Sequence, residues 1–320
     1  MMKTIIVILA FIAGSVYAQY SYQATLTGNA QRAGETNTFR ISVLKENKPA
    51  YTIERTLPFD VPAPLISLNE HSGMLVLRYV FDGFAEVYSS SGNKVWENNF
   101  FKDEEPNYER TLGAALGDSS IFFLLSDTKR ERAVVQKFSL DGALQWTVQL
   151  PHQYAYDIAL SPDERTILAG SYLALEDEVR QSTAILSSDG KIEGDINIIF
   201  RKAAFAQEQR LVALMSEREV VVISLDSKKE IGKVSKQRNQ AIFTDVCWKG
   251  SELVVQESEV VTPADSRYYF ANPTFTWYSQ DMTKRKEQHI DGITFHQSRL
   301  VSVSAGIEFR YDGNIRLLQQ

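Results

Sequence analysis

Apolar and polar positions alternate along much of the chain in short runs that polar turns separate. Residues 138–150, FSLDGALQWTVQL, are typical of two strands joined by an Asp-Gly turn. Residues 87–100, VYSSSGNKVWENNF, repeat this hairpin, with Trp96 in the place of Trp146. Strict alternation is typical of half-buried strands, and Asp-Gly or Ser-Gly pairs tolerate the positive φ of a tight hairpin turn. The pattern therefore predicts β-hairpins.

A longer repeat surrounds these hairpins. An apolar strand, a polar turn and a second apolar strand recur about every 45 residues, which is the period of a four-stranded propeller blade. The last apolar residues before the turn are Leu68, Leu116, Leu160, Phe205, Trp248 and Phe295. A second pair of strands is expected after each inner hairpin, and copies of it are found at residues 87–100, 138–150, 184–198, 220–234 and 307–319.

Residues 20–57 contain three further strand-like runs, which leave room for one more copy of the repeat. We therefore predict an all-β fold, a single β-propeller of about seven four-stranded blades over residues 19–320. The alternative is six blades preceded by N-terminal strands, because residues 20–57 match the repeat poorly. Outside the first residues, helical periodicity is absent from the sequence pattern.

Two short motifs resemble known propeller families. Residues 160–171, LSPDERTILAGS, resemble a turn of WD-repeat and YVTN-type propellers. The segments SGNKVW and DGALQW resemble part of the pyrroloquinoline-quinone-type repeat. That resemblance implies that Trp96 and Trp146 pack between adjacent blades. The quinoprotein motif has Ala and Asp where this chain has Glu86 and Tyr88 before Trp96.

The first residues predict export. Lys3 precedes the apolar run of residues 5–13, and Val16 and Ala18 are suited to a signal-peptidase site. Spanning a bilayer takes roughly 20 apolar residues, so this run predicts a cleaved signal peptide, residues 1–18, and no membrane span in the mature chain. The single cysteine, Cys247, allows no internal disulfide, which is ordinary for a bacterial periplasm. The predicted location is therefore periplasmic or secreted.

The balance of charge restricts the partners. The chain has 34 Lys and Arg against 40 Asp and Glu. Affinity for nucleic acid comes from neutralising phosphates with Lys and Arg, so the acidic balance predicts no nucleic-acid partner. We expect a protein or another extracytoplasmic ligand as the partner.

Recognisable catalytic motifs are absent from the sequence, so we expect no catalytic residues, no metal and no cofactor. Asp157 and Asp245 hold the same place in two repeats, at the start of a strand expected to line the mouth of the central channel. A repeated Asp more often bonds turn amides than does chemistry. Both residues remain candidates for a ligand site.

The candidate binding surface is the segment at residues 256–275, where about twenty residues separate two strand patterns. Long connections in compact domains are often functional, and Tyr and Arg are frequent in binding hot spots. The candidate contact residues are Arg267, Tyr268, Tyr269 and Phe270. In the alternative, the strands are longer and the aromatic residues pack on a neighbouring element.

A complete repeat without a catalytic motif favours a secreted or periplasmic scaffold that binds a partner and does no chemistry. The alternative is a propeller enzyme with its site at the central channel. Such an enzyme would be a lactonase-like hydrolase or a quinone-dependent dehydrogenase. The presence of Asp157 and Asp245 keeps this alternative open.

Overall fold

A computed structural model describes residues 7–11, 20–28, 30–102, 105, 109–127, 129, 131–206, 210–236, 238–262 and 269–318. The regular secondary structure in these ranges is entirely β-strand, as the alternating pattern predicts. The described residues contain no helix that is long and apolar enough to cross a membrane. The chain divides into two compact units, residues 1–158 and 159–320.

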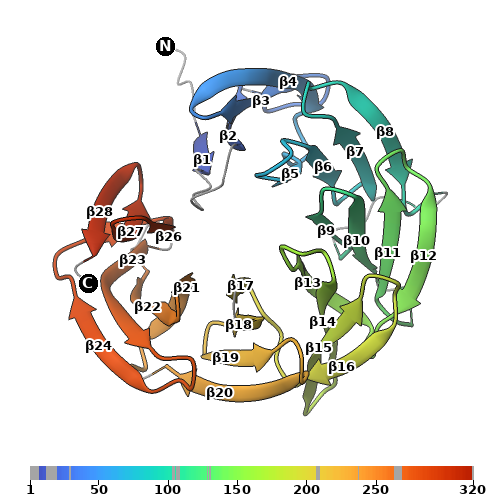
Figure 1. The fold of residues 1–320 in the computed structure, drawn as a ribbon. Helices are drawn as coiled ribbons and strands as arrows, with labels where there is room; N and C mark the ends of the chain where they lie inside the picture. Colours follow the sequence, from blue (N-terminus) through green and yellow to red (C-terminus); the bar gives the residue numbers. More distant parts are fainter. Residues whose placement is uncertain are drawn as a thin grey trace. The chain divides into compact units, whose positions relative to one another are not determined.

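The first unit contains three antiparallel sheets, each with its strands in chain order (Figure 1). They are β1 (Val7–Phe11), β2 (Tyr20–Thr27), β3 (Thr36–Lys45) and β4 (Lys48–Pro58); β5 (Leu65–Leu68), β6 (Leu75–Tyr79), β7 (Phe84–Tyr88) and β8 (Lys94–Asn99); and β9 (Thr111–Leu116), β10 (Ser120–Ser126), β11 (Val134–Ser139) and β12 (Leu144–Gln149).

The next two sheets also have four strands each in chain order, and the boundary between the units falls within β13. They are β13 (Tyr154–Leu160), β14 (Thr166–Ala174), β15 (Val179–Ser187) and β16 (Ile192–Ile196); and β17 (Lys202–Ala206), β18 (Leu211–Met215), β19 (Glu219–Ser224) and β20 (Lys229–Ser235).

The last two sheets depart from this plan. The sixth has β21 (Ala241–Lys249), β22 (Glu252–Val261), β23 (Tyr269–Tyr278) and β24 (Lys284–His289), and the short β25 (Thr294–Phe295) also pairs with β23. The seventh has only β26 (Ser298–Val303), β27 (Gly306–Tyr311) and β28 (Asn314–Leu318) in the described residues. The repeat pattern predicts Phe295 in the first strand of the last copy, but in the structure it pairs with Phe270 in the sixth sheet.

The N-terminal strands form a sheet of their own, because β2, β3 and β4 pair in order over residues 20–58. The seven sheets thus correspond to the seven-copy prediction. β1 lies inside the predicted signal peptide and pairs along β2, from Val7 opposite Leu26 to Phe11 opposite Tyr22.

Within each unit the core lies between successive sheets, because alternate residues of a strand point to opposite faces. Leu75 and Leu77 of β6 pack against the first sheet, while Val76 between them packs against the third. Burial on both faces explains the continuous apolar run of β10, whose seven residues are all buried.

Large and small residues alternate across the outer edges of neighbouring sheets. Trp96 on β8 covers the turn between β11 and β12, where its indole Nε1 donates to the Leu140 carbonyl at 3.0 Å. A Cβ on Gly142 of that turn would lie 2.8 Å from the Trp96 ring. Tyr51 on β4 covers Gly92, in the turn between β7 and β8, in the same way. The structure therefore confirms the predicted interface position of Trp96.

In the second unit the large residue is in the turn and the glycine is on the strand that covers it. Gly194 on β16 and Gly232 on β20 have the place that Trp96 has on β8. The turns that face them carry Lys228 and Met282, whose φ angles of 58° and 62° lie in the left-handed region. One partner of each contact is thus bulky and the other is glycine, which keeps neighbouring sheets at similar spacing.

The two residues that depart from the quinoprotein motif before Trp96, Glu86 and Tyr88, belong to one polar cluster. The Glu86 carboxylate is 6% exposed and accepts hydrogen bonds from Arg55 Nε at 2.9 Å and from the Tyr88 hydroxyl at 2.8 Å. Tyr79 donates to it at 3.1 Å, and burial raises the pKa of Tyr79. Because Arg55 lies on β4, the cluster joins the first and second sheets.

Candidate functional site

The sixth sheet contains the longest hairpin of the second unit that the structure describes. β22 and β23 have ten residues each, so the connection predicted from the sequence is largely strand. Tyr269 pairs with Val261, and Phe270 pairs with Val260. Arg267 and Tyr268 lie outside the described residues, between the ends of these two strands.

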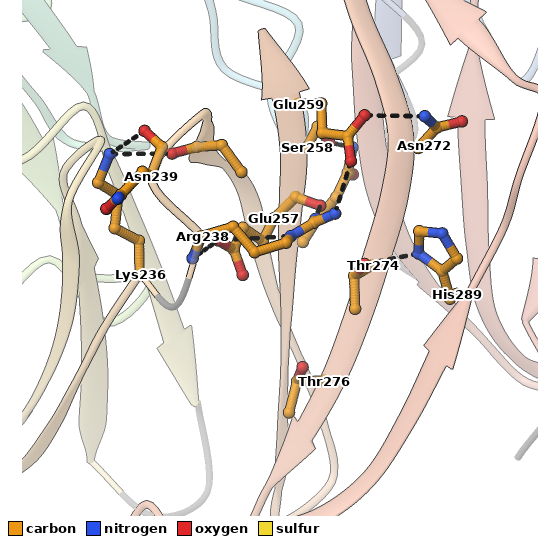
Figure 2. A network of polar contacts seen from close by, with 12 residues as sticks. Lys236, Arg238, Asn239, Glu257, Ser258, Glu259, Asn272, Thr274, Thr276 and His289 are labelled. Atoms are coloured by element: carbon orange, nitrogen blue, oxygen red, sulfur yellow. Dashed lines mark hydrogen bonds and ion pairs between the residues drawn. The ribbon is translucent and has the colours of Figure 1, made fainter.

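A polar network braces one side of this hairpin (Figure 2). Arg238, in the segment before β21, donates from Nη1 to Glu259 at 3.1 Å and from Nη2 to the Glu257 carbonyl at 3.3 Å. The Glu257 carboxylate accepts the backbone amide of Arg238 at 3.2 Å. Lys236 ties the same segment together by donating to the carbonyls of Asn239 and Ala241 at 3.1 and 3.2 Å.

Asn272 connects the hairpin to the segment that precedes β25. Its amide donates to Glu259 at 2.8 Å and its side-chain oxygen accepts from Gly292 at 3.1 Å. The Asn272 φ of 46° coincides with a register shift between Glu257 and Glu259. An irregularity of this kind redirects side chains, and Asn tolerates left-handed backbone better than most residues.

The two described aromatic candidates are held in place by neighbouring residues. Tyr269 lies 4.1 Å from the His296 ring between centroids, and Phe270 lies 5.7 Å from the Phe295 ring. Both candidate rings are half-buried, whereas Val261, opposite Tyr269, is 40% exposed. This arrangement agrees with the alternative stated for residues 256–275, in which the strands are longer and the aromatic residues pack on a neighbouring element. It still leaves Val261 accessible.

Asp245 is bound on all sides and 2% exposed. Its carboxylate accepts from the amide of Val246 at 2.8 Å, from the ammonium of Lys202 on β17, and from the amide of Leu300 on β26. It therefore links three sheets of the second unit.

Alternate residues of β21 contact the outer edge of β26, along which no strand pairs in the described residues. Lys249 donates to the Val303 carbonyl, as Asp245 accepts from Leu300. Cys247 lies between them, and burial raises the pKa of its thiol against the opposing effects of Lys202 and the Ser302 amide. A thiol of this kind is a poor nucleophile, because the thiolate is the reactive form.

Asp157 has much sparser surroundings than Asp245. Its carboxylate accepts one hydrogen bond in the described structure, from the Ile158 amide at 2.8 Å. Burial raises the pKa of Asp157 to about 6, and the charge of Arg78 opposes that rise only in part. The two Asp residues hold the same place in the repeat, but their surroundings in the structure differ.

The residues that sequence analysis missed are charged partners from distant strands. Arg78 and Arg238 carry the clearest signal, since Arg78 interrupts an apolar strand and Arg238 precedes one. Each has a carboxylate neighbour far along the chain, which a local pattern does not contain. The described residues contain no group of three or more His, Cys, Asp or Glu that could hold a metal ion.

No family model matches the chain, and no curated protein matches it in sequence. Solved structures do match it in fold. Sqt1 from Saccharomyces cerevisiae aligns with a TM-score of 0.58 at 9% identity, over 93% of this chain and 89% of that chain. A chain of a Mitotic Checkpoint Complex structure aligns with a TM-score of 0.59 at 10% identity, over 97% and 89%.

A propeller structure of Dos1 also aligns, with a TM-score of 0.59 at 10% identity over 92% of this chain and 74% of that chain. The chain is a β-propeller repeat protein. Its propeller has about seven blades. Virginiamycin B lyase from Staphylococcus aureus matches the propeller too, with a TM-score of 0.55 at 12% identity over 98% of both chains. At these identities the similarities concern the fold alone.

Proposed function

We propose that this propeller is an exported bacterial scaffold, periplasmic or secreted, which binds a protein or another extracytoplasmic ligand and does no chemistry. The supporting observation is the long β22–β23 hairpin, which Arg238 and Asn272 brace against neighbouring segments. A braced surface loses little conformational entropy on binding. The leader-like residues 1–18 and the single cysteine support export.

The binding surface would include Val261, which is 40% exposed, and Tyr269, its half-buried partner across the hairpin. Phe270 points to the opposite face, where it packs on Phe295. Aromatic side chains held by their neighbours are suited to interface anchors. One of the similar propellers belongs to a Mitotic Checkpoint Complex structure. For this chain, the geometry of the β22–β23 hairpin is the basis for proposing that it binds a protein. The similarity to a lyase concerns the fold and assigns no reaction to this chain.

Affinity capture with surface variants tests this proposal. Val261→Glu adds a charge to the hairpin, and Leu144→Glu adds the same charge at a 53% exposed position on β12. We expect Val261→Glu to lower the recovery of the specific partner by about tenfold or more, while Leu144→Glu retains it. Equal recovery with both folded variants would exclude the hairpin as the binding surface.

A further inference from the structure

A cavity of about 310 Å³ lies between the fourth and fifth sheets, within the second unit. Its walls come from the turn between β13 and β14 and from segments at the ends of β17, β18 and β19. The lining residues that matter here are Ser161, Pro162, Asp163, Phe205, Arg210 and Leu225. A cavity with apolar walls and a few convergent polar groups is the usual form of a small-molecule site.

Arg210 joins the two walls of this cavity. Its Nη1 donates to Asp163 at 2.5 Å, and its Nε donates to Asp226, in the turn between β19 and β20, at 2.6 Å. Its Nη2 makes no hydrogen bond to the described part of the chain. The side chains of Arg210 and Asp163 are 33% and 39% exposed, so a ligand can reach both from solvent.

Asp163 is fixed by the turn that carries it. Its Oδ1 accepts hydrogen bonds from the Ser161 hydroxyl at 2.6 Å and from the Arg165 amide at 3.2 Å. Among the described residues its Oδ2 accepts only Arg210, so one of the roughly four lone-pair positions of the carboxylate is still available. Because Nη1 and Oδ2 are bonded to each other, the unused Nη2 donor and the unused Oδ2 position lie side by side.

We infer that this cavity binds a neutral sugar ring, either as a free hexose or as one residue of a glycan. A hydroxyl group both donates and accepts hydrogen bonds, so two adjacent hydroxyls match the donor of Arg210 and the acceptor of Asp163. The Phe205 ring provides a broad apolar surface for the C–H face of the sugar. The site lies apart from the hairpin of the sixth sheet and does not depend on the proposed scaffold role.

The charges at the cavity favour a neutral ligand over a charged one. The single guanidinium of Arg210 already has two carboxylates as partners, those of Asp163 and Asp226. An anion would therefore meet a net negative charge, and a cation would lie against the guanidinium.

Calorimetric titration of the full chain at constant ionic strength tests the ligand class. The neutral probes are glucose, mannose and galactose with their methyl glycosides, and at least one of the six should bind saturably. Comparing each hexose with its glycoside distinguishes a free sugar from a linked one as the source. The uronic acid and the 2-amino sugar of the best-binding ring should each bind at least about tenfold more weakly. Absence of binding by all six, or equal binding of a charged ring, would overturn the inference.

Matched variants test the location of the site. Arg210→Lys keeps the positive charge between the two carboxylates but removes Nη2, and should lower the affinity at least about tenfold. Arg201→Lys makes the same change at an exposed arginine that pairs with Glu217, and should bind as the wild type does. Phe205→Leu gives a reading that does not require Arg210→Lys to fold, and should lower the affinity at least about fivefold because the flat ring is lost. Wild-type affinity in folded Arg210→Lys or in Phe205→Leu would overturn the assignment to this cavity.

Discussion

Asp157 and Asp245 occupy the same place in two copies of the repeat, three residues before the last apolar residue of the strand. Asp245 is bound by Lys202 and by two backbone amides. Asp157 accepts one amide and has its pKa raised by burial. The same residue at the same place in the repeat can therefore differ in its contribution to stability. The difference comes from partners on neighbouring sheets, which the repeat does not specify.

The raised pKa of Asp157 predicts a pH-dependent gain in stability for Asp157→Asn. The folded-state pKa of about 6 lies above the ordinary value of 3.8, so the folded protein holds this proton more tightly than the unfolded chain. Stability due to Asp157 therefore falls as pH rises from about 4 to about 6. Allowing for partial exposure, the loss is about 1–2 kcal/mol at pH 8.

Asp157→Asn should consequently be about 1–2 kcal/mol more stable than the wild type at pH 8 and no more stable near pH 4. Urea unfolding at the two pH values measures the difference. A stability change of equal size at both pH values would show that ionisation of Asp157 has no part in it.

Asp245→Asn is expected to act in the opposite direction. Loss of the carboxylate leaves Lys202 without its ion-pair partner and weakens the bond to the Leu300 amide. Removing one member of a buried pair costs about 3–5 kcal/mol, and the partial exposure of Lys202 places the expectation at about 2–3 kcal/mol at pH 7. Urea unfolding is again the measurement, and wild-type stability would contradict the structural role.

At the scale of the strands, the hairpins were predictable because their signal is local. The turn of residues 138–150 contains Gly142 with a φ of 92°, a conformation that its Asp-Gly sequence favours. Trp96 could be assigned to a sheet interface on its motif, and the structure confirms that position. Alternation and turn chemistry act over a few residues, so a single sequence contains them.

Long-range pairing was not predictable in the same way. Phe295 ends a run that resembles the other repeats, yet its strand pairs with Phe270 in the preceding sheet. Arg55 reaches Glu86 from a different sheet, and Arg238, in the segment before β21, reaches Glu259 on β22. These contacts depend on how sheets pack together, and the alternation of polar and apolar residues does not encode it.

The exchange of large and small residues between sheets predicts the behaviour of a swap at Trp96 and Gly142. Gly142→Lys alone forces a Cβ against the Trp96 ring and should destabilise the fold by about 2–4 kcal/mol. Trp96→Gly alone removes a ring that stacks on Phe138 at 5.4 Å and should cost about 3–5 kcal/mol.

The double variant reproduces the Gly194–Lys228 arrangement of the second unit. It should therefore lose at least about 2 kcal/mol less than the sum of the two single losses. A double-mutant cycle by chemical unfolding gives this coupling. Purely additive losses would mean that the complementarity between neighbouring turns has no energetic role.

At the scale of the whole molecule, the central question is whether the mature propeller begins after the predicted signal peptide. Cleavage after Ala18 would remove β1 and leave β2 at the edge of a three-stranded first sheet. We expect the exported protein to begin at Gln19, and intact-mass measurement of the periplasmic or secreted fraction determines it. A chain that keeps residues 1–18 would mean that β1 stays in the sheet.

The proposed role makes the β22–β23 hairpin the surface that meets a partner. A photo-reactive residue at position 261 on the hairpin, compared with one at position 144 on β12, tests this most directly, because both native side chains are exposed. Irradiation of living cells should give a discrete cross-linked product from position 261 and none from position 144. Identical cross-linking patterns from the two positions, or no product from position 261, would contradict a binding role for the hairpin.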